Sequence, residues 1–283
     1  MSPGVRYILV ATVFFTLMNV GVKALTRIPS HEIVFFRAVV MLVVAYALVR
    51  RHGLSPWGNN KRLLLARGLS GTVALVLYFY TVQQMPLSSA VTVQYLSPLF
   101  TIMFAAALVH ERARAAQWPF FIIAFAGVAL IKGFDARVSG LELTAGVTSA
   151  LFSGLAYNFV RMLKDHDHPW VVVFYFPLVT VPIVGVYTAF HWVTPHGWEW
   201  AVLLFIGLCT TAFQINMTKA YHADRAANVS VFNYLGTPLA IGLGYLMFDE
   251  AIGLLAAIGF GLIIFGVVMS TRYSTTRGVK TGR

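Results

Sequence analysis

The sequence is poor in cysteine and in charge. Of its 283 residues only one is a cysteine, Cys209, so no disulfide can form within the chain. Charged residues make up 11%, against about 25% in an ordinary soluble domain. The patterns His-Glu-x-x-His and Gly-x-Ser-x-Gly, which mark metalloproteases and many hydrolases, are also absent. These absences argue against an enzyme embedded in a membrane, which is a different class of function from the one that the rest of the sequence favours.

What the chain has instead is apolar length, since 58% of its residues are hydrophobic. A membrane helix needs about 20 apolar residues, so the chain has room for ten helices and no separate soluble domain. The sequence therefore predicts an all-α integral membrane protein with ten transmembrane helices. Their expected ranges are 5–24, 32–50, 63–84, 88–110, 116–132, 140–163, 170–190, 199–220, 225–248 and 251–272.

The chain also repeats itself. When the first half is shifted by 139 positions, similar residues coincide: Asn19 with Asn158, Gly68 with Gly207, Thr72 with Thr211, Gln94 with Asn233, Tyr95 with Tyr234, Glu111 with Glu250, and Gly127 with Gly266. Five spans are an odd number, so the second copy must enter the bilayer upside down. We expect two inverted five-helix repeats, residues 1–135 and 136–283, the second with a short basic tail.

The distribution of basic residues predicts the orientation. Most of the 21 Lys and Arg residues, Arg67 among them, fall on the side of the predicted topology that holds both termini. The opposite side has only Lys23, Arg27, Lys132 and Arg137. By the positive-inside rule both termini should be cytoplasmic. The basic tail 272–283 then contacts anionic lipid headgroups, and the net charge of +11 does not indicate a nucleic-acid partner.

Several short motifs occur in a familiar order. They are His-Glu-Ile-Val-Phe-Phe-Arg at 31–37, Arg-Gly at 67–68, Tyr-Phe-Tyr at 78–80, Pro-Leu-Ser-Ser-Ala at 86–90, Leu-Ser-Pro-Leu-Phe-Thr at 96–101, His-Glu-Arg at 110–112, Gln-Trp at 117–118 and Gly-Val at 127–128. Together they resemble the drug/metabolite transporter superfamily, EamA type. Within it the pattern is most similar to the branch of S-adenosylmethionine carriers and acyl-malonyl-condensing-enzyme-like proteins.

This resemblance implies a ten-helix carrier of the bacterial inner membrane, built from two inverted repeats. It also implies a central cavity lined mainly by helices one, three, four, six, eight and nine. It does not imply a substrate, because the superfamily carries amino acids, nucleotide derivatives, cofactors and drugs. The second half departs from the pattern: at the counterpart of Phe-Phe-Arg it has Phe174-Tyr175-Phe176, without the arginine.

Polar side chains within the predicted spans are the candidate substrate-binding residues, because polar groups in lipid are costly and face the protein interior or a wet cavity. The candidates are Asn19, Arg37, Tyr78, Gln94, Tyr95, Asn158, Gln214, Asn233 and Tyr234. Pro98 and Pro238 follow two of these pairs and free backbone carbonyls beside them. The alternative is that the amides link helices, at about 0.6 kcal/mol each.

Three further features have structural interpretations that we favour. Arg37 could bind an anionic substrate group, but it could equally snorkel or pair with Glu32, Glu142 or a helix C-terminus. Glu111 and Glu250 suit the start of the helix that follows each of them. The cluster 165–168, Asp-His-Asp-His, resembles a metal site but is better explained as a solvated loop.

The sequence thus favours a secondary carrier that exports or exchanges a small polar or amphipathic metabolite, such as an amino acid, by alternating access. An S-adenosylmethionine-like solute remains an alternative, because tyrosine faces can hold a sulfonium. We expect no cofactor and no metal. The partners expected are a small-molecule substrate and membrane lipids, and a homodimer is left open.

Overall fold

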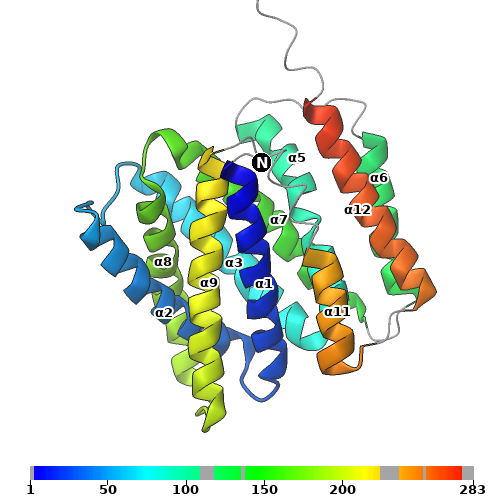
Figure 1. The fold of residues 1–283 in the computed structure, drawn as a ribbon, viewed down its shortest axis with the longest axis horizontal. Helices are drawn as coiled ribbons and strands as arrows, with labels where there is room; N and C mark the ends of the chain where they lie inside the picture. Colours follow the sequence, from blue (N-terminus) through cyan, green and yellow to red (C-terminus); the bar gives the residue numbers. More distant parts are fainter. Residues whose placement is uncertain (1–2, 109–117, 135–137, 224–235, 251–252, 276–283) are drawn as a thin grey trace, which may run out of the picture.

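The computed structural model is an all-α membrane protein whose helices run roughly along one axis (Figure 1). It describes residues 3–108, 118–134, 138–223, 236–250 and 253–275. The helices are α1 (Pro3–Ala24), α2 (Ser30–Arg51), α3 (Lys61–Gln84), α4 (Leu87–Gln94), α5 (Ser97–Leu108), α6 (Trp118–Phe134), α7 (Gly140–Met162), α8 (Pro169–Phe190), α9 (Trp198–Ala223), α11 (Gly236–Phe248) and α12 (Leu254–Thr275).

Seven of the described segments are long and apolar enough to cross a membrane, among them Leu87–Ala105, which joins α4 and part of α5. Shorter apolar stretches lie at Trp118–Gly127, Leu239–Phe248 and Ala257–Gly266. Over the described residues the predicted ranges agree with the helices to within a few residues, with one correction. The predicted span 88–110 is broken at Tyr95 and Leu96, just before Pro98, because a proline cannot continue the backbone hydrogen bonds of a helix. The predicted span 225–248 begins outside the described residues, and only its part from Gly236 on, α11, can be compared.

Local sequence explains where several helices begin. Ser139 and Glu142 form a capping box at the start of α7, in which each side chain bonds the backbone of the other. The Asn60 side chain accepts a hydrogen bond from the Leu63 N–H at the start of α3. Pro169 occupies the first turn of α8, where its missing N–H costs nothing. These residues determine where the helices start, and the apolar stretches between the loops form the helix packing.

The helices pack in a consistent set of pairs. In the centre, α1 packs on α9 and α3 packs on α7; α2 packs on α8 at one edge, and α6 packs on α12 at the other (Figure 1). The start of α1 and the end of α12 lie at the same end of the bundle, the near end, and the opposite end is the far end (Figure 1).

Close glycine contacts recur at the 139-residue offset. A Cβ on Gly68 would lie 2.7 Å from the Cβ of Val179, and one on Gly207 would lie 2.5 Å from the Cβ of Val40. Positions 40 and 179 are themselves 139 apart. In one contact the glycine comes from the first half and the valine from the second, and in the other contact this is reversed. Gly58 and Gly197, also 139 apart, both have positive φ, 63° and 44°.

A side chain in the loop before α8 fastens the near end of the bundle. Asp167 is 5% exposed and accepts hydrogen bonds from the N–H groups of Asn59 (2.6 Å) and Asn60 (3.1 Å). Interpreting the whole cluster 165–168 as a solvated loop is therefore wrong for Asp167, which ties this loop to the start of α3. In the described part of the chain, no group of three or more His, Cys, Asp or Glu is placed to hold a metal ion.

Ion pairs close the far end. Glu250 accepts hydrogen bonds from the Leu87 N–H, at 3.0 and 2.7 Å to its two oxygens, and lies 3.2 Å from Lys23 Nζ. The acidic charge therefore serves the start of α4, which corrects the expectation that Glu250 serves the helix after it. Beside this cluster Arg27 pairs with Glu199, and that hydrogen bond raises the pKa of Arg27 above its ordinary value.

Replacing Asp167 by Ala removes the acceptor of two backbone N–H groups. We expect the free energy of unfolding to fall by about 1–3 kcal/mol, the usual cost of leaving a buried group unsatisfied. Asp165→Ala is the matched control, because Asp165 is exposed and its side chain makes no hydrogen bond within the described residues; it should cost less than about 0.5 kcal/mol. Thermal unfolding of the purified protein measures both, and equal losses would contradict the assignment.

Replacing Glu250 by Gln removes the charge that holds Lys23 and the start of α4. We expect deuterium uptake in residues 87–94 to become about tenfold faster, because hydrogen bonds to a charged acceptor contribute about 1.5–3 kcal/mol. Hydrogen-exchange mass spectrometry of protein in lipid nanodiscs measures it. The neighbouring exposed acid gives the control, Asp249→Asn, since asparagine also tolerates the φ of 51° found there. Similar uptake in both variants would show that the far end is not held by Glu250.

Candidate functional site

A polar cavity lies in the centre of the bundle, on the near-end side of its middle. It consists of two adjoining pockets that share Phe15, Gln94, Tyr157 and Phe213 in their linings. Its walls come from α1, α3, α4, α5, α7 and α9, with Phe176 of α8. The resemblance implied most of these walls: helices one, three, four, six and eight of the expected set. The remaining helix of that expected set, helix nine, begins outside the described residues.

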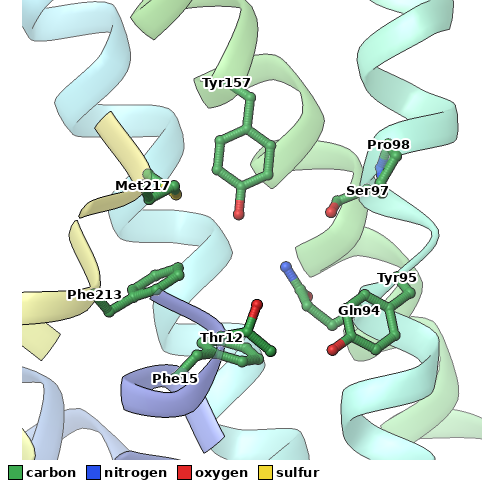
Figure 2. Close-up of a pocket in the computed structure, with 9 residues that line it drawn as sticks. All are labelled: Thr12, Phe15, Gln94, Tyr95, Ser97, Pro98, Tyr157, Phe213 and Met217. Carbon is green, nitrogen blue, oxygen red and sulfur yellow. The ribbon is translucent and has the colours of Figure 1, made fainter. Parts of the chain in front are cut away.

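Side chains from different helices point into the same space. Figure 2 shows the Tyr157 hydroxyl, the Gln94 amide and the Thr12 hydroxyl directed toward one another from α7, α4 and α1. Phe15 and Phe213 close the side of α1 and α9, with ring centroids 5.0 Å apart. The space left for the centres of water molecules is about 30 Å³ in one pocket and about 60 Å³ in the other. That is enough for a few waters, so an organic solute would need the cavity to open further.

The break between α4 and α5 brings Gln94 and Tyr95 to this cavity. Gln94 is the last residue of α4, and Tyr95 is the residue that caps its carboxyl end. The Tyr95 hydroxyl lies so close to Gly236 that a Cβ there would be 2.1 Å from it, so a larger residue at this position would displace the tyrosine. Both predicted residues therefore line the cavity, and the interrupted helix is what turns them inward.

Gln94 also links two helices. Its Nε2 donates to Ser153 Oγ (2.8 Å), and Ser149 Oγ lies 3.0 Å from its Oε1. Ser149 has a single proton, however, and its oxygen is closer to the Ala74 carbonyl, at 2.6 Å. When Ser149 donates to Ala74, the Gln94 oxygen is left to accept from a solute. The Gln94 amide can therefore link α4 to α7 through its nitrogen and bind a solute through its oxygen, so the two predicted roles are compatible.

The structure brings four of the predicted site residues to the cavity: Tyr78, Gln94, Tyr95 and Gln214. Asn19 is fully buried outside the cavity lining, and neither polar atom of its amide has a hydrogen-bond partner among the described residues. Asn158 donates to the carbonyls of Thr101 (3.0 Å) and Gly154 (2.9 Å) and so links α7 to α5. The predicted residues Asn233 and Tyr234, and Glu111, lie outside the described residues.

Arg37 is buried at 1% exposure and is not part of the cavity lining. Its guanidinium lies 5.4 Å from the ring centroid of Phe79 and 5.7 Å from that of Phe176. Neither suggested partner pairs with it: Glu32 accepts from the Val193 N–H, and Glu142 belongs to the capping box of α7. Among the described residues, aromatic faces hold this charge, and neither carboxylate that was a possible partner does.

Sequence reasoning missed Arg67, which it placed among the basic residues of the cytoplasmic side. The structure buries Arg67 at 3% exposure in the cavity wall. Its Nη2 donates to Gln214 Oε1 (3.2 Å), and its guanidinium lies 4.2 Å from the ring centroid of Phe176. The only sequence signal for a buried Arg67 was its position, the seventh residue of an apolar helix. An arginine that faces the lipid headgroups would occupy the same kind of position, so this signal did not decide between the two.

A larger groove of about 700 Å³ lies elsewhere, between α2, α3, α7 and α8. Its lining is mainly apolar, and Leu141, Ile183 and Tyr187 are exposed there by 69%, 47% and 53%. Exposed apolar side chains of this kind are typical of a surface that faces lipid. The smaller central cavity, where polar groups from several helices converge, is the better candidate for a solute site.

Comparison with known proteins agrees with this architecture. The model of the EamA-like transporter family matches two segments of the chain, residues 2–133 and 141–272. The pseudopaline exporter of Pseudomonas aeruginosa is 31% identical over 279 residues, which are 96% of this chain and 97% of that protein. The riboflavin transporter of Rhizobium johnstonii is 27% identical over 88% of this chain and 84% of its own length.

Two more distant likenesses extend over most of the chain. The S-adenosylmethionine uptake transporter of Rickettsia felis is 22% identical, covering 87% of this chain and 85% of its own length. A protein crystal structure with 20% identity shares the fold with a TM-score of 0.71, over 96% of this chain and 97% of that one. With the membrane-spanning helices and the central polar cavity, these matches show that the chain belongs to the EamA-like transporter family and is a multi-pass membrane transporter of a small-molecule metabolite, not an enzyme.

Proposed function

We propose that the protein is a secondary transporter that exports a small polar or amphipathic organic metabolite, such as an amino acid, by alternating access. The observation that carries this proposal is the central cavity, where Gln94, Tyr157 and Thr12 converge from three helices. The name of the Pseudomonas aeruginosa relative, an exporter, supports the direction. The absence of an acidic side chain among the described lining residues favours a zwitterionic solute over a divalent cation.

The proposed architecture is ten spans in two inverted repeats, residues 1–135 and 136–283, with both termini in the cytoplasm. The two segments matched by the family model support it, and so do the exchanged contacts of Gly68 with Val179 and of Gly207 with Val40. In such a pair of halves, exchanging their conformations opens the other side of the membrane. The state described here has ion pairs at the far end and its cavity nearer the near end, as expected for an inward-facing or closed state.

An S-adenosylmethionine-like solute is the second candidate. The name of the Rickettsia felis relative supports it, and the cavity offers Tyr78, Tyr157 and Phe213 as faces for a sulfonium. The nearby guanidinium of Arg67 opposes a cationic group at that end. A carboxylate-bearing solute satisfies both ends better than a purely cationic one.

Transport itself is tested in proteoliposomes with a panel of amino acids, nucleosides and S-adenosylmethionine at two pH values. We expect at least one solute to accumulate by counterflow in sealed vesicles, and this accumulation should vanish when the vesicles are permeabilised. Empty vesicles are the control. Chemical conversion of a solute by the protein in detergent, without two-sided transport, would contradict the proposal.

Replacing Gln94 by Ala should lower the initial rate of that counterflow about tenfold or more, because Gln94 and Tyr157 are the two polar side chains that line both pockets. We expect a modest loss of stability as well, about 1 kcal/mol, since a link to α7 is lost. Ser149→Ala removes a link to Gln94 from outside the cavity lining and should lower stability alone. Gln84→Ala, an exposed glutamine at the end of α3, should change neither. If Ser149→Ala matches Gln94→Ala in transport, Gln94 serves only to join helices.

A further inference from the structure

The central cavity contains a single charged side chain, Arg67, among the described residues that line it. This guanidinium is 3% exposed, and its Nε has no hydrogen-bond partner. Its one hydrogen bond to a described residue goes to a neutral amide oxygen, that of Gln214, 3.2 Å away. The wall of the cavity thus carries a full positive charge that no described acidic residue balances.

Of the described carboxylates, Asp165 and Asp249 are exposed, and the others are engaged elsewhere. Glu250 holds Lys23, Glu199 holds Arg27, Glu32 binds the Val193 N–H, Glu142 caps α7 and Asp167 binds the start of α3. A buried unpaired charge costs several kcal/mol, and a membrane interior raises this cost. A guanidinium kept in this position needs a compensating interaction, which the fold alone does not supply.

A second cation strengthens the positive character of this wall. The guanidinium of Arg37 lies 5.7 Å from the ring centroid of Phe176, and that of Arg67 lies 4.2 Å from the same ring. The aromatic face stabilises each charge, but it adds no negative charge. Because low-dielectric walls focus the field of such groups, the cavity favours the entry of anionic groups.

We propose that the transported solute carries a carboxylate and that Arg67 binds it, which rests on the transport function proposed above. A carboxylate matches the planar guanidinium and can take two charge-assisted hydrogen bonds from it. The free Nε supplies one donor, and an Nη group supplies the other. Gln214 lies beside Arg67 in the cavity wall, and its side-chain oxygen orients the guanidinium by accepting a hydrogen bond from it. The rest of the solute then extends past Phe213 and Tyr157 towards Gln94, where the lining is neutral and polar.

Matched pairs of solutes test the charge without any mutation. The full chain in lipid nanodiscs is titrated by calorimetry with N-acetylalanine and N-acetylalaninamide, with succinate and succinamide, and with glycerol 3-phosphate and glycerol. We expect each carboxylate to bind at least about tenfold tighter than its amide, the difference that a charge-assisted hydrogen bond makes. Equal binding of acid and amide would overturn the proposal. Tighter binding of the phosphate than of either carboxylate would overturn it in favour of a phosphate-bearing solute.

Variants locate the effect at Arg67. In Arg67→Gln the preference for acid over amide should fall to about one, and Arg67→Lys, which keeps the charge without the planar fork, should retain part of it. Arg6→Gln, an exposed arginine on α1, should behave as the unchanged protein does. Without ligand, the melting temperature of Arg67→Gln should be equal or higher, because an uncompensated buried charge has been removed. An acid preference that persists in Arg67→Gln would overturn the proposal, and a lower melting temperature of that variant without ligand would then assign Arg67 to folding instead.

Transport separates this proposal from the one on which it rests. If the protein moves a neutral solute across sealed vesicles and Arg67→Gln leaves that rate unchanged, the carboxylate assignment fails and the transport function stands. If carboxylates bind with the expected preference but no solute crosses the membrane, the transport function fails and the binding site stands.

Discussion

The hydrocarbon of a bilayer offers no hydrogen bonds, so every polar group inside this bundle must find its partner within the protein or in a wet cavity. The interruption of the fourth span at Tyr95 and Leu96 is possible only under that condition. One helix, α7, meets much of it: Ser149, Ser153 and Asn158 face α4 and α5 and bond their side chains or backbone. Gly154 lets the two backbones approach, since a Cβ there would lie 2.8 Å from the Thr101 nitrogen.

The same arrangement places the cavity. Once α4 ends at Gln94, the chain restarts at Ser97 with its side chains turned differently, and the space between the two pieces and α7 is lined by an amide and hydroxyl groups. Irregular backbone at membrane depth is tolerated where it lines a cavity, and the residues around this break, Gln94, Tyr95 and Ser97, all line the cavity.

Much of this could be predicted from the sequence. Apolar length fixed the helices, and polar residues within them pointed to Gln94, Tyr95, Tyr78 and Gln214 at the cavity. Asn158 was among the predicted binding residues but links α7 to α5, because an amide in a span looks the same whether it faces a neighbouring helix or a solute. Arg67 was missed, because a basic residue near the start of a span looks the same whether it faces headgroups or the interior. The contact of Glu250 with Leu87, 163 positions apart, has no local signature at all.

The contact between Arg37 and Phe176 bears on how alike the two halves are. These positions are 139 residues apart, the offset at which similar residues recur, and they meet each other where α2 packs on α8. One side of this contact is a cation and the other an aromatic face, so the two positions are not interchangeable. Any movement of α2 against α8 therefore changes the surroundings of a buried charge from one side only.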